Sequence, residues 1–133
     1  MQVAVWDTYA KSRSGEILHF DIIVPQELRQ EALIFGYGQK YLASKEEPSE
    51  GLSAEECRFC HIGEPTQAMI DAIRQQGYYI LEMDSIPAVL PVAASRSKKI
   101  GYLRAHFPAY RFEHFAGRSE ADIDQLLIRE GVL

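Results

Sequence analysis

Two stretches near the N-terminus decide the fold: Val3-Ala4-Val5-Trp6-Asp7-Thr8-Tyr9 and Glu16-Ile17-Leu18-His19-Phe20-Asp21-Ile22-Ile23-Val24. Both are rich in β-branched and aromatic residues, which predicts two strands. A turn over residues 11–15 would join them as a hairpin. Alternation places two sets of side chains of the second strand on opposite faces, Leu18, Phe20, Ile22 and Val24 on one and Ile17, His19, Asp21 and Ile23 on the other.

Helices and short strands are predicted to follow the hairpin. Pro25 is suited to the first turn of a helix, and apolar residues keep helical spacing as far as Leu42. Residues 56–62 predict a short strand or a knuckle. A second helix is expected from Pro65 to Gly77, followed by a strand over residues 78–83.

The remaining residues predict a second set of elements. Residues 88–93 are an expected edge strand, because Pro91 cannot donate to a central ladder. Ser95 is placed to cap a helix that runs to residue 106, and residues 110–115 alternate like a strand. Ser119 with Asp122 forms a capping-box-like start for the last helix. The order ββα(β)αβ, then (β)αβα, predicts an α/β fold with a mixed sheet covered by helices.

Composition indicates one domain with its own core. The chain has 133 residues and a net charge of −5, which argues against a general polyanion binder. The charge is uneven, because residues 85–133 hold seven Lys and Arg against five Asp and Glu. A basic C-terminal surface would explain this asymmetry, and so would an electrostatic match between the two parts of the chain.

Targeting signals are not evident in the sequence. The start of the chain lacks a basic region followed by an apolar one, and its apolar runs are shorter than the roughly 18 residues of a membrane span. We therefore expect a cytoplasmic protein without a membrane partner, in which both cysteines are reduced.

The first 84 residues contain pieces with a distinctive order and spacing: Val5-Trp6-Asp7-Thr8-Tyr9, His19-Phe20-Asp21, Val24-Pro25, Ser53-Ala54-Glu55-Glu56-Cys57-Arg58-Phe59-Cys60-His61 and Gly77-Tyr78-Tyr79-Ile80-Leu81-Glu82-Met83. In these pieces the chain resembles a family of small bacterial proteins defined only as domain of unknown function number twenty twenty-four. The resemblance implies a compact mixed α/β fold and no activity.

Residues 85–133 lie outside the resemblance, so the chain looks like a longer variant of that family. We expect a single domain over residues 1–133, with a family-like core (residues 1–84) and a C-terminal βαβα extension (residues 85–133). Gly36 and Gly38 depart from the helix-forming residues that the family resemblance implies, and each weakens a helix by about 1 kcal/mol relative to Ala.

A candidate metal site centres on Cys57, Cys60 and His61. A C-x-x-C pair can grip one ion from a tight turn, and zinc, the candidate cofactor, needs four ligands. The fourth would come from His19, or else from another residue in the set Asp21, His106 and His114. In a regular strand, however, Cys57 and Cys60 would point to opposite faces, which excludes joint binding and leaves two packed thiols.

Two other chemistries of this motif are disfavoured. The letters C-x-x-C-H also match a c-type haem attachment site, but that chemistry requires export. A thioredoxin-like dithiol needs its first cysteine at a helix N-terminus, whereas the nearest predicted helix begins at Pro65.

A polar cluster is predicted from Asp7, His19 and Asp21. His19 and Asp21 project from the same strand face, and Asp7 can join them from the paired strand. A carboxylate that orients an imidazole is the beginning of a general-base site, and a nearby cysteine would add a nucleophile. The alternative is a hydrogen-bonded polar cluster on a partly exposed sheet face.

A basic segment over residues 96–118 is a candidate nucleic-acid site. Its cations are interleaved with aromatic residues, including Phe112, as single-stranded nucleic acid requires. The cations proposed for this role are Arg96, Lys98, Lys99, Arg104 and Arg111. The alternative, which we favour, places the aromatics in a core and the charges on a solvated helix face.

The sequence therefore favours a non-enzymatic binding or assembly module with an unidentified protein partner or with self-association. The alternative is a metal- or thiol-dependent enzyme centred on the Cys57-Cys60-His61 motif. Nucleic-acid binding by residues 96–118 ranks third.

Overall fold

A four-stranded antiparallel sheet forms the centre of the computed structural model, which describes residues 1–133 except for the side chain of Phe112. The strand order is β3-β1-β2-β4. The strands are β1 (Val3–Lys11), β2 (Ile17–Pro25), β3 (Cys57–Gly63) and β4 (Tyr79–Glu82). The α/β fold class is confirmed, and β1 and β2 form the expected hairpin at its centre.

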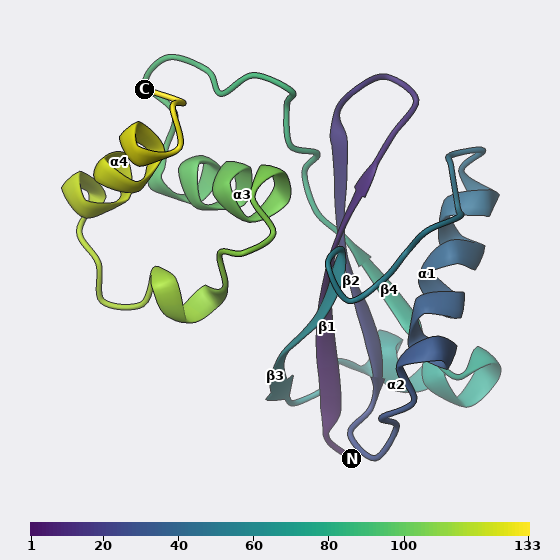
Figure 1. Cartoon of the computed structure of the whole chain (residues 1–133). Coiled ribbons are helices and arrows are strands. Elements are labelled where there is room, and N and C mark those ends of the chain that lie inside the picture. The colour runs from purple at the N-terminus through teal and green to yellow at the C-terminus, as the bar shows by residue number, and fades with distance from the viewer.

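Helices lie on both sides of this sheet (Figure 1). They are α1 (Glu31–Ser44), α2 (Gln67–Gln76), α3 (Arg96–His106) and α4 (Glu120–Arg129), with a short 3₁₀ turn η1 (Phe112–His114) between the last two. Figure 1 shows α1 on one side of the sheet and α3 and α4 on the other, with α2 near the N-terminal end of β1. Among the described residues, no helix combines the length and apolar character that crossing a membrane would need.

The two faces of the β1–β2 hairpin have different covers. Even-numbered residues, among them Trp6, Phe20 and Ile22, pack with Ile34 and Leu42 of α1 in the main apolar cluster. At one end of the odd-numbered face, Val3, Val5 and Ile23 pack against Ile73 of α2. We call these three hairpin residues the apolar half. Period-two alternation thus gives the hairpin two buried faces at this end.

Helix α1 differs from the prediction in where it begins. Pro25 is the last residue of β2, opposite Val3, and the helix starts at Glu31. Gly38, which weakens α1 by propensity, has a packing reason: a Cβ there would lie 2.6 Å from Leu52 Cδ2 and 2.9 Å from Ile22 Cδ1. A Cβ on Gly36 would meet nothing within 4 Å.

The predicted C-terminal end of α2 and the predicted starts of α3 and α4 are confirmed, whereas α2 begins at Gln67 and not at Pro65. Gly77 ends α2 in the left-handed conformation. Ser95 accepts a hydrogen bond from the Lys98 backbone N–H at the start of α3, and Ser119 with Asp122 forms a reciprocal capping box at the start of α4. These side chains satisfy backbone N–H groups that a helix N-terminus leaves free.

The two strands predicted in the extension are wrong. Residues 88–93 form bends and turns, and only Ile86 forms a bridge, with Ile17 of β2. Pro87 precedes this stretch and Pro91 lies within it, neither has an N–H to donate, and Val92 is 99% exposed. Residues 110–115 contain η1 rather than a strand. Tyr110 and Phe115 both pack inward, a spacing of five that period-two alternation does not allow, and the Phe112 side chain lies outside the described residues.

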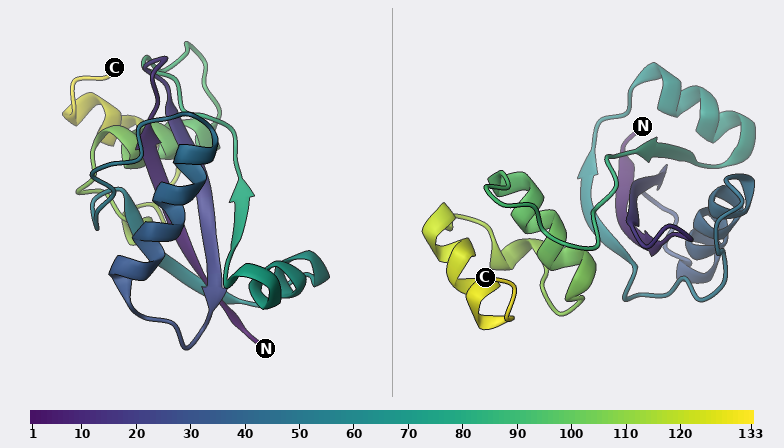
Figure 2. Two further views of the ribbon diagram at one scale, coloured as in Figure 1. Left: turned by 90° about the vertical axis from the view of Figure 1, so that its right-hand side faces the viewer. Right: turned by 90° about the horizontal axis from the view of Figure 1, so that it is seen from above.

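The extension has an apolar cluster of its own. Leu103 of α3 packs there against Ile123, Leu126 and Leu127 of α4. Tyr110 and Phe115 are the other buried residues of this cluster. The two further views in Figure 2 show α3 and α4 beside the sheet, with a long connection from β4. All buried members of this cluster come from the extension, so its contact with the sheet rests on other residues.

Candidate functional site

The other end of the odd-numbered hairpin face is polar. Four residues occupy it, and we call them the polar half: Asp7, Tyr9, His19 and Asp21. Antiparallel register places Asp7 opposite Asp21 and Tyr9 opposite His19. Directly opposite residues share one face at short range, so the hairpin itself brings these side chains together.

Asp7 and His19 form a hydrogen-bonded pair. His19 Nε2 lies 2.7 Å from Asp7 Oδ1. The His19 ring stacks on Tyr9, with ring centroids 4.3 Å apart and an interplanar angle of 11°. Asp7 is only 5% exposed, whereas the His19 side chain is 20% exposed. The imidazole therefore has a fixed orientation and keeps some access to solvent.

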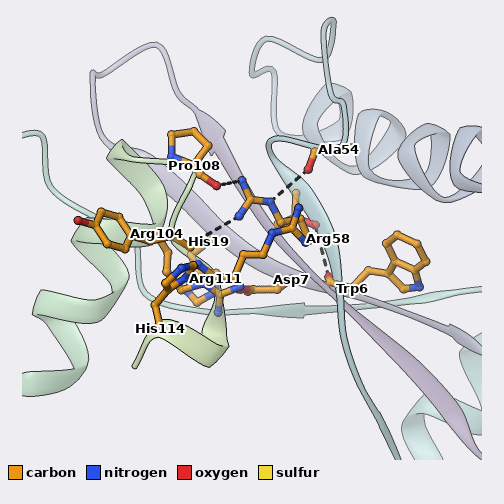
Figure 3. Close-up of polar contacts among 11 residues, drawn as sticks. Trp6, Asp7, His19, Ala54, Arg58, Arg104, Pro108, Arg111 and His114 are labelled. Atoms are coloured by element: carbon orange, nitrogen blue, oxygen red, sulfur yellow. Dashed lines mark hydrogen bonds and ion pairs between the residues drawn. The ribbon is translucent and has the colours of Figure 1, made fainter. Parts of the chain in front are cut away.

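Arg104 of α3 completes the cluster (Figure 3). Its Nη2 lies 2.6 Å from Asp7 Oδ2, and its guanidinium carbon lies 5.7 Å from the centre of the Tyr9 ring. The Arg104 and Asp7 side chains are 12% and 6% exposed. Leu103, one residue earlier, packs into the α3–α4 cluster, so α3 turns its apolar side to α4 and presents Arg104 to the sheet.

The two acids of the polar half have opposite pKa shifts. Burial alone would raise the pKa of Asp7, but the hydrogen bond to His19 and the charge of Arg104 outweigh it and hold the pKa below its usual value. Burial and then the neighbouring Asp7 charge raise the pKa of Asp21 to about 6. Asp7 is thus the ionised partner of Arg104, and Asp21 retains a proton more readily.

A second arginine joins the sheet to the extension from the opposite direction. Arg58 of β3 lies across from Asp7 in the strand pairing. Its Nη1 donates to the Tyr110 carbonyl oxygen at 3.1 Å and its Nη2 to the Pro108 carbonyl oxygen, while Nε donates to Ala54. The sheet and the extension therefore each contribute one guanidinium to their contact, Arg58 from β3 and Arg104 from α3 (Figure 3).

The predicted metal ligands are not brought together. Cys57 is buried in the cluster beneath α1 and pairs with Thr8. Cys60 lies near Asp7 and Arg104 on the other face, beside a bulge in β3, and the neighbouring His61 is exposed. The sheet separates the two thiols, as a regular strand would, so the C-x-x-C pair cannot grip one ion.

Neither thiol is set up as a nucleophile. Burial raises the pKa of Cys57 to about 12, and burial also raises the pKa of Cys60. Thiols with raised pKa values stay protonated at neutral pH, and the thiolate is the reactive form. The group of His, Cys, Asp and Glu ligand atoms found within 4.8 Å of one another among the described residues is Asp7, His19 and Asp21.

The cations of the basic segment make contacts in different parts of the structure. Lys99 pairs with Glu120 at 3.0 Å and Asp124 at 2.8 Å within the extension, and Arg104 pairs with Asp7. Arg96 donates to the Phe115 carbonyl oxygen, while Lys98 and Arg111 are exposed. The predicted cations thus do not present one uniform face to a nucleic acid.

Sequence reasoning missed the roles of Arg58 and Arg104. The one available signal was the charge asymmetry. Two acids on a buried hairpin face require a cation, and the basic excess lies in the extension.

A pocket opens beside the polar half at the seam between the sheet and the extension. It has a volume of about 710 Å³. Tyr9 and His19 line it from the hairpin, and Ser95, Ser97 and Lys98 line it from the start of α3. The exposed part of the His19 ring is therefore reached from this side.

Comparison with known proteins separates the core from the extension. A solved structure, the NMR structure of protein NE1680 from Nitrosomonas europaea, a Northeast Structural Genomics Consortium target, is 36% identical with a TM-score of 0.56. The match covers 63% of this chain and 96% of that one. Among curated proteins, none matches the chain. The sequence profile described as Domain of unknown function (DUF2024) matches residues 1–83. The chain therefore belongs to the DUF2024 family.

Proposed function

We propose that the family core, residues 1–84, is a protein-binding module whose polar half accepts an arginine-bearing helix, and that α3 of the extension is its occupant in this chain. The observation that carries the proposal is the Arg104–Asp7 ion pair, 2.6 Å long and buried on both sides. On this reading the protein assembles or regulates rather than turns over a substrate.

The energetics of buried charge support this reading. An ionised carboxylate in a dry site is costly without a partner, and removal of one partner of a buried pair typically costs about 3–5 kcal/mol. Asp7 therefore demands a cation, which makes the polar half selective for a guanidinium or an ammonium. The guanidinium of Arg104 supplies this cation, and the aromatic ring of Tyr9 beside it makes a cation–π contact.

The division of the apolar clusters supports it as well. The extension buries its own cluster between α3 and α4, and its contacts with the sheet include polar groups of Arg58, Asp7 and Arg104 beside the bridge between Ile86 and Ile17. Interfaces of this polar kind resemble those of transient protein complexes. A docked, exchangeable segment fits this pattern better than an extension of the sheet's own core.

The family comparison adds a third argument. The profile ends at residue 83, and nearly the whole of the NE1680 chain is covered by less than two thirds of this chain. A unit of that length therefore has a solved structure without the extension. The core of this chain is expected to fold alone and to present its polar half to other partners when α3 is away.

The test is to cut the connection in the folded protein. A site-specific protease sequence replaces residues 89–92, where Val89 and Val92 are 78% and 99% exposed. After cleavage, the wild-type fragments are expected to stay together on size-exclusion chromatography at low and at high salt, because salt screens a buried ion pair only weakly. Arg104→Gln fragments are expected to separate under all conditions.

Lys98→Gln is the matched control, because it removes the same charge from an exposed position of the same helix. Its fragments are expected to behave like wild type. The proposal is wrong if Arg104→Gln fragments remain associated as tightly as wild-type ones, or if Lys98→Gln separates them equally well.

A further inference from the structure

We propose that Asp7, His19 and Asp21 form a site for a divalent transition-metal cation, and that Arg104 competes with that ion for the site. The inference rests on the proposed function, because it assigns a regulator to the same polar half. Occupation by the metal and docking of α3 would then exclude each other.

The donor set matches such an ion. Two carboxylates and an imidazole are suited to Zn²⁺ and to Mn²⁺ or Co²⁺ in a mixed nitrogen–oxygen site. Their ligand atoms already lie within 4.8 Å of one another. A tetrahedral ion with bonds of roughly 2.0–2.2 Å separates its ligands by about 3.3–3.6 Å, so small side-chain rotations close the site. A fourth position remains for water.

The two acids are short of positive charge. Asp7 and Asp21 are 5% and 8% exposed, and they face each other across the hairpin. Arg104 is the cation in direct contact with Asp7 Oδ2, an atom that is sealed from solvent and has no well-directed hydrogen bond among the described residues. A cation thus already contacts one of these acids, and it is a tethered one with a single charge.

A divalent ion would neutralise the charge of the two carboxylates more fully than the single charge of Arg104 does. It would displace Arg104 from Asp7 Oδ2 and take the place of the hydrogen bond between His19 Nε2 and Asp7 Oδ1. His19 would bind through Nε2 as the neutral imidazole, with its one ring proton on Nδ1. The pocket of about 710 Å³ that reaches His19 gives the ion a route from the outside.

Arg104 is the part of the site that the extension controls. When α3 is docked, its guanidinium occupies the position that the ion needs. When α3 is away, Asp7, His19 and Asp21 remain together, because β1 and β2 alone hold them in register. The metal would therefore favour the undocked extension, and the docked extension would weaken metal binding by the same factor.

The experiment is Zn²⁺ titration by calorimetry at neutral pH on the untagged full chain. Arg104→Gln is expected to bind one Zn²⁺ at least about tenfold more tightly than wild type, because the competing cation is gone. Asp21→Asn, added to Arg104→Gln, is expected to lose that gain. This substitution is nearly isosteric, so the fold is expected to be preserved.

Further variants separate this site from the cysteine motif. Cys60→Ser with His61→Gln, in the Arg104→Gln chain, is expected to leave Zn²⁺ affinity unchanged, and His19→Gln is expected to reduce it. Co²⁺ bound to Arg104→Gln is expected to lack a sulfur-to-cobalt charge-transfer band. Loss of binding in the cysteine variant, or equal affinity in wild type and Arg104→Gln, would overturn the inference.

The cleaved protein links metal to docking. Zn²⁺ is expected to promote separation of the wild-type fragments, and a chelator is expected to restore their association. No effect of Zn²⁺ on separation would overturn the competition. That result would still leave the Arg104-dependent association of the fragments intact, so failure of the metal inference is distinguishable from failure of the binding-module proposal.

Discussion

The two halves of one hairpin face have the same strands, the same register and the same alternation, yet they serve different purposes. The apolar half is covered by α2 from within the family core, through contacts with Ile73. The polar half is covered by α3 from outside the family profile, through Arg104. Burial of carbon stabilises a fold without selecting a partner, whereas a buried acid accepts only a cation. We interpret the first half as structural and the second as a binding site.

The largest expected effect belongs to the apolar half. Ile23→Ala removes a side chain that is 1% exposed and should lower the free energy of unfolding by about 3 kcal/mol. Urea denaturation followed by far-UV circular dichroism measures the loss. The sheet and α2 should be affected together. Release of the extension with the stability of the sheet unchanged would contradict the structural role of this half.

The polar half should instead give a pH dependence. The pKa of Asp21 is raised from 3.8 to about 6, chiefly by burial and then by the charge of Asp7. Its protonated form therefore favours folding below about pH 4, and this contribution is lost as the pH rises through about 6. The loss is on the order of 3 kcal/mol.

Asp21→Asn tests this dependence, since an amide cannot ionise. The variant should equal wild type in acid and exceed it in stability at neutral pH. Asp7 acts in the opposite direction: its lowered pKa contributes stability that is lost as the pH falls through the folded-state value. Denaturation midpoints measured across the acid and neutral pH range report both the Asp21 and the Asp7 contributions. Parallel curves for Asp21→Asn and wild type would show that Asp21 is solvated.

Two glycine substitutions in α1, which covers the opposite face of the hairpin, have smaller expected effects and measure the contribution of packing alone. Gly38→Ala brings a methyl group into Leu52 and Ile22, and should cost about 1–2 kcal/mol. Gly36→Ala, two residues earlier and in open space, should stabilise α1 by about 0.5–1 kcal/mol. Thermal melting of both variants gives the comparison. Equal shifts in the same direction would mean that helix propensity alone decides, and that the close approach at Gly38 has no cost.

Local chemistry explains what the sequence could predict. The alternation of residues 16–24 predicts that His19 and Asp21 share a face, and the hairpin register then places Asp7 beside them. Ser95 and Ser119 indicate helix starts, because capping depends on three or four neighbouring residues. In each case the cause lies within a short stretch of chain or between adjacent strands.

Distant contacts explain what it could not. The partner of Asp7 is Arg104, on a helix outside the family core, and no local pattern links the two. The bulge beside Cys60, which shifts the register of β3, depends on the pairing of that strand with β1. Residues 110–115 resemble a strand in sequence, but Tyr110 and Phe115 pack with residues of α3 and α4 instead of on a sheet. Tertiary packing overrides β propensity in such segments.

The central claim is that the ion pair between Asp7 and Arg104 docks the extension on the polar half, and a double-mutant cycle on the cleaved protein tests it most directly. The dissociation constant of the two fragments is measured for wild type, Asp7→Asn, Arg104→Gln and the double variant. We predict a coupling free energy above about 1.5 kcal/mol, as found for close charge pairs across interfaces. Additive effects, with coupling within about 0.3–0.5 kcal/mol of zero, would contradict the claim.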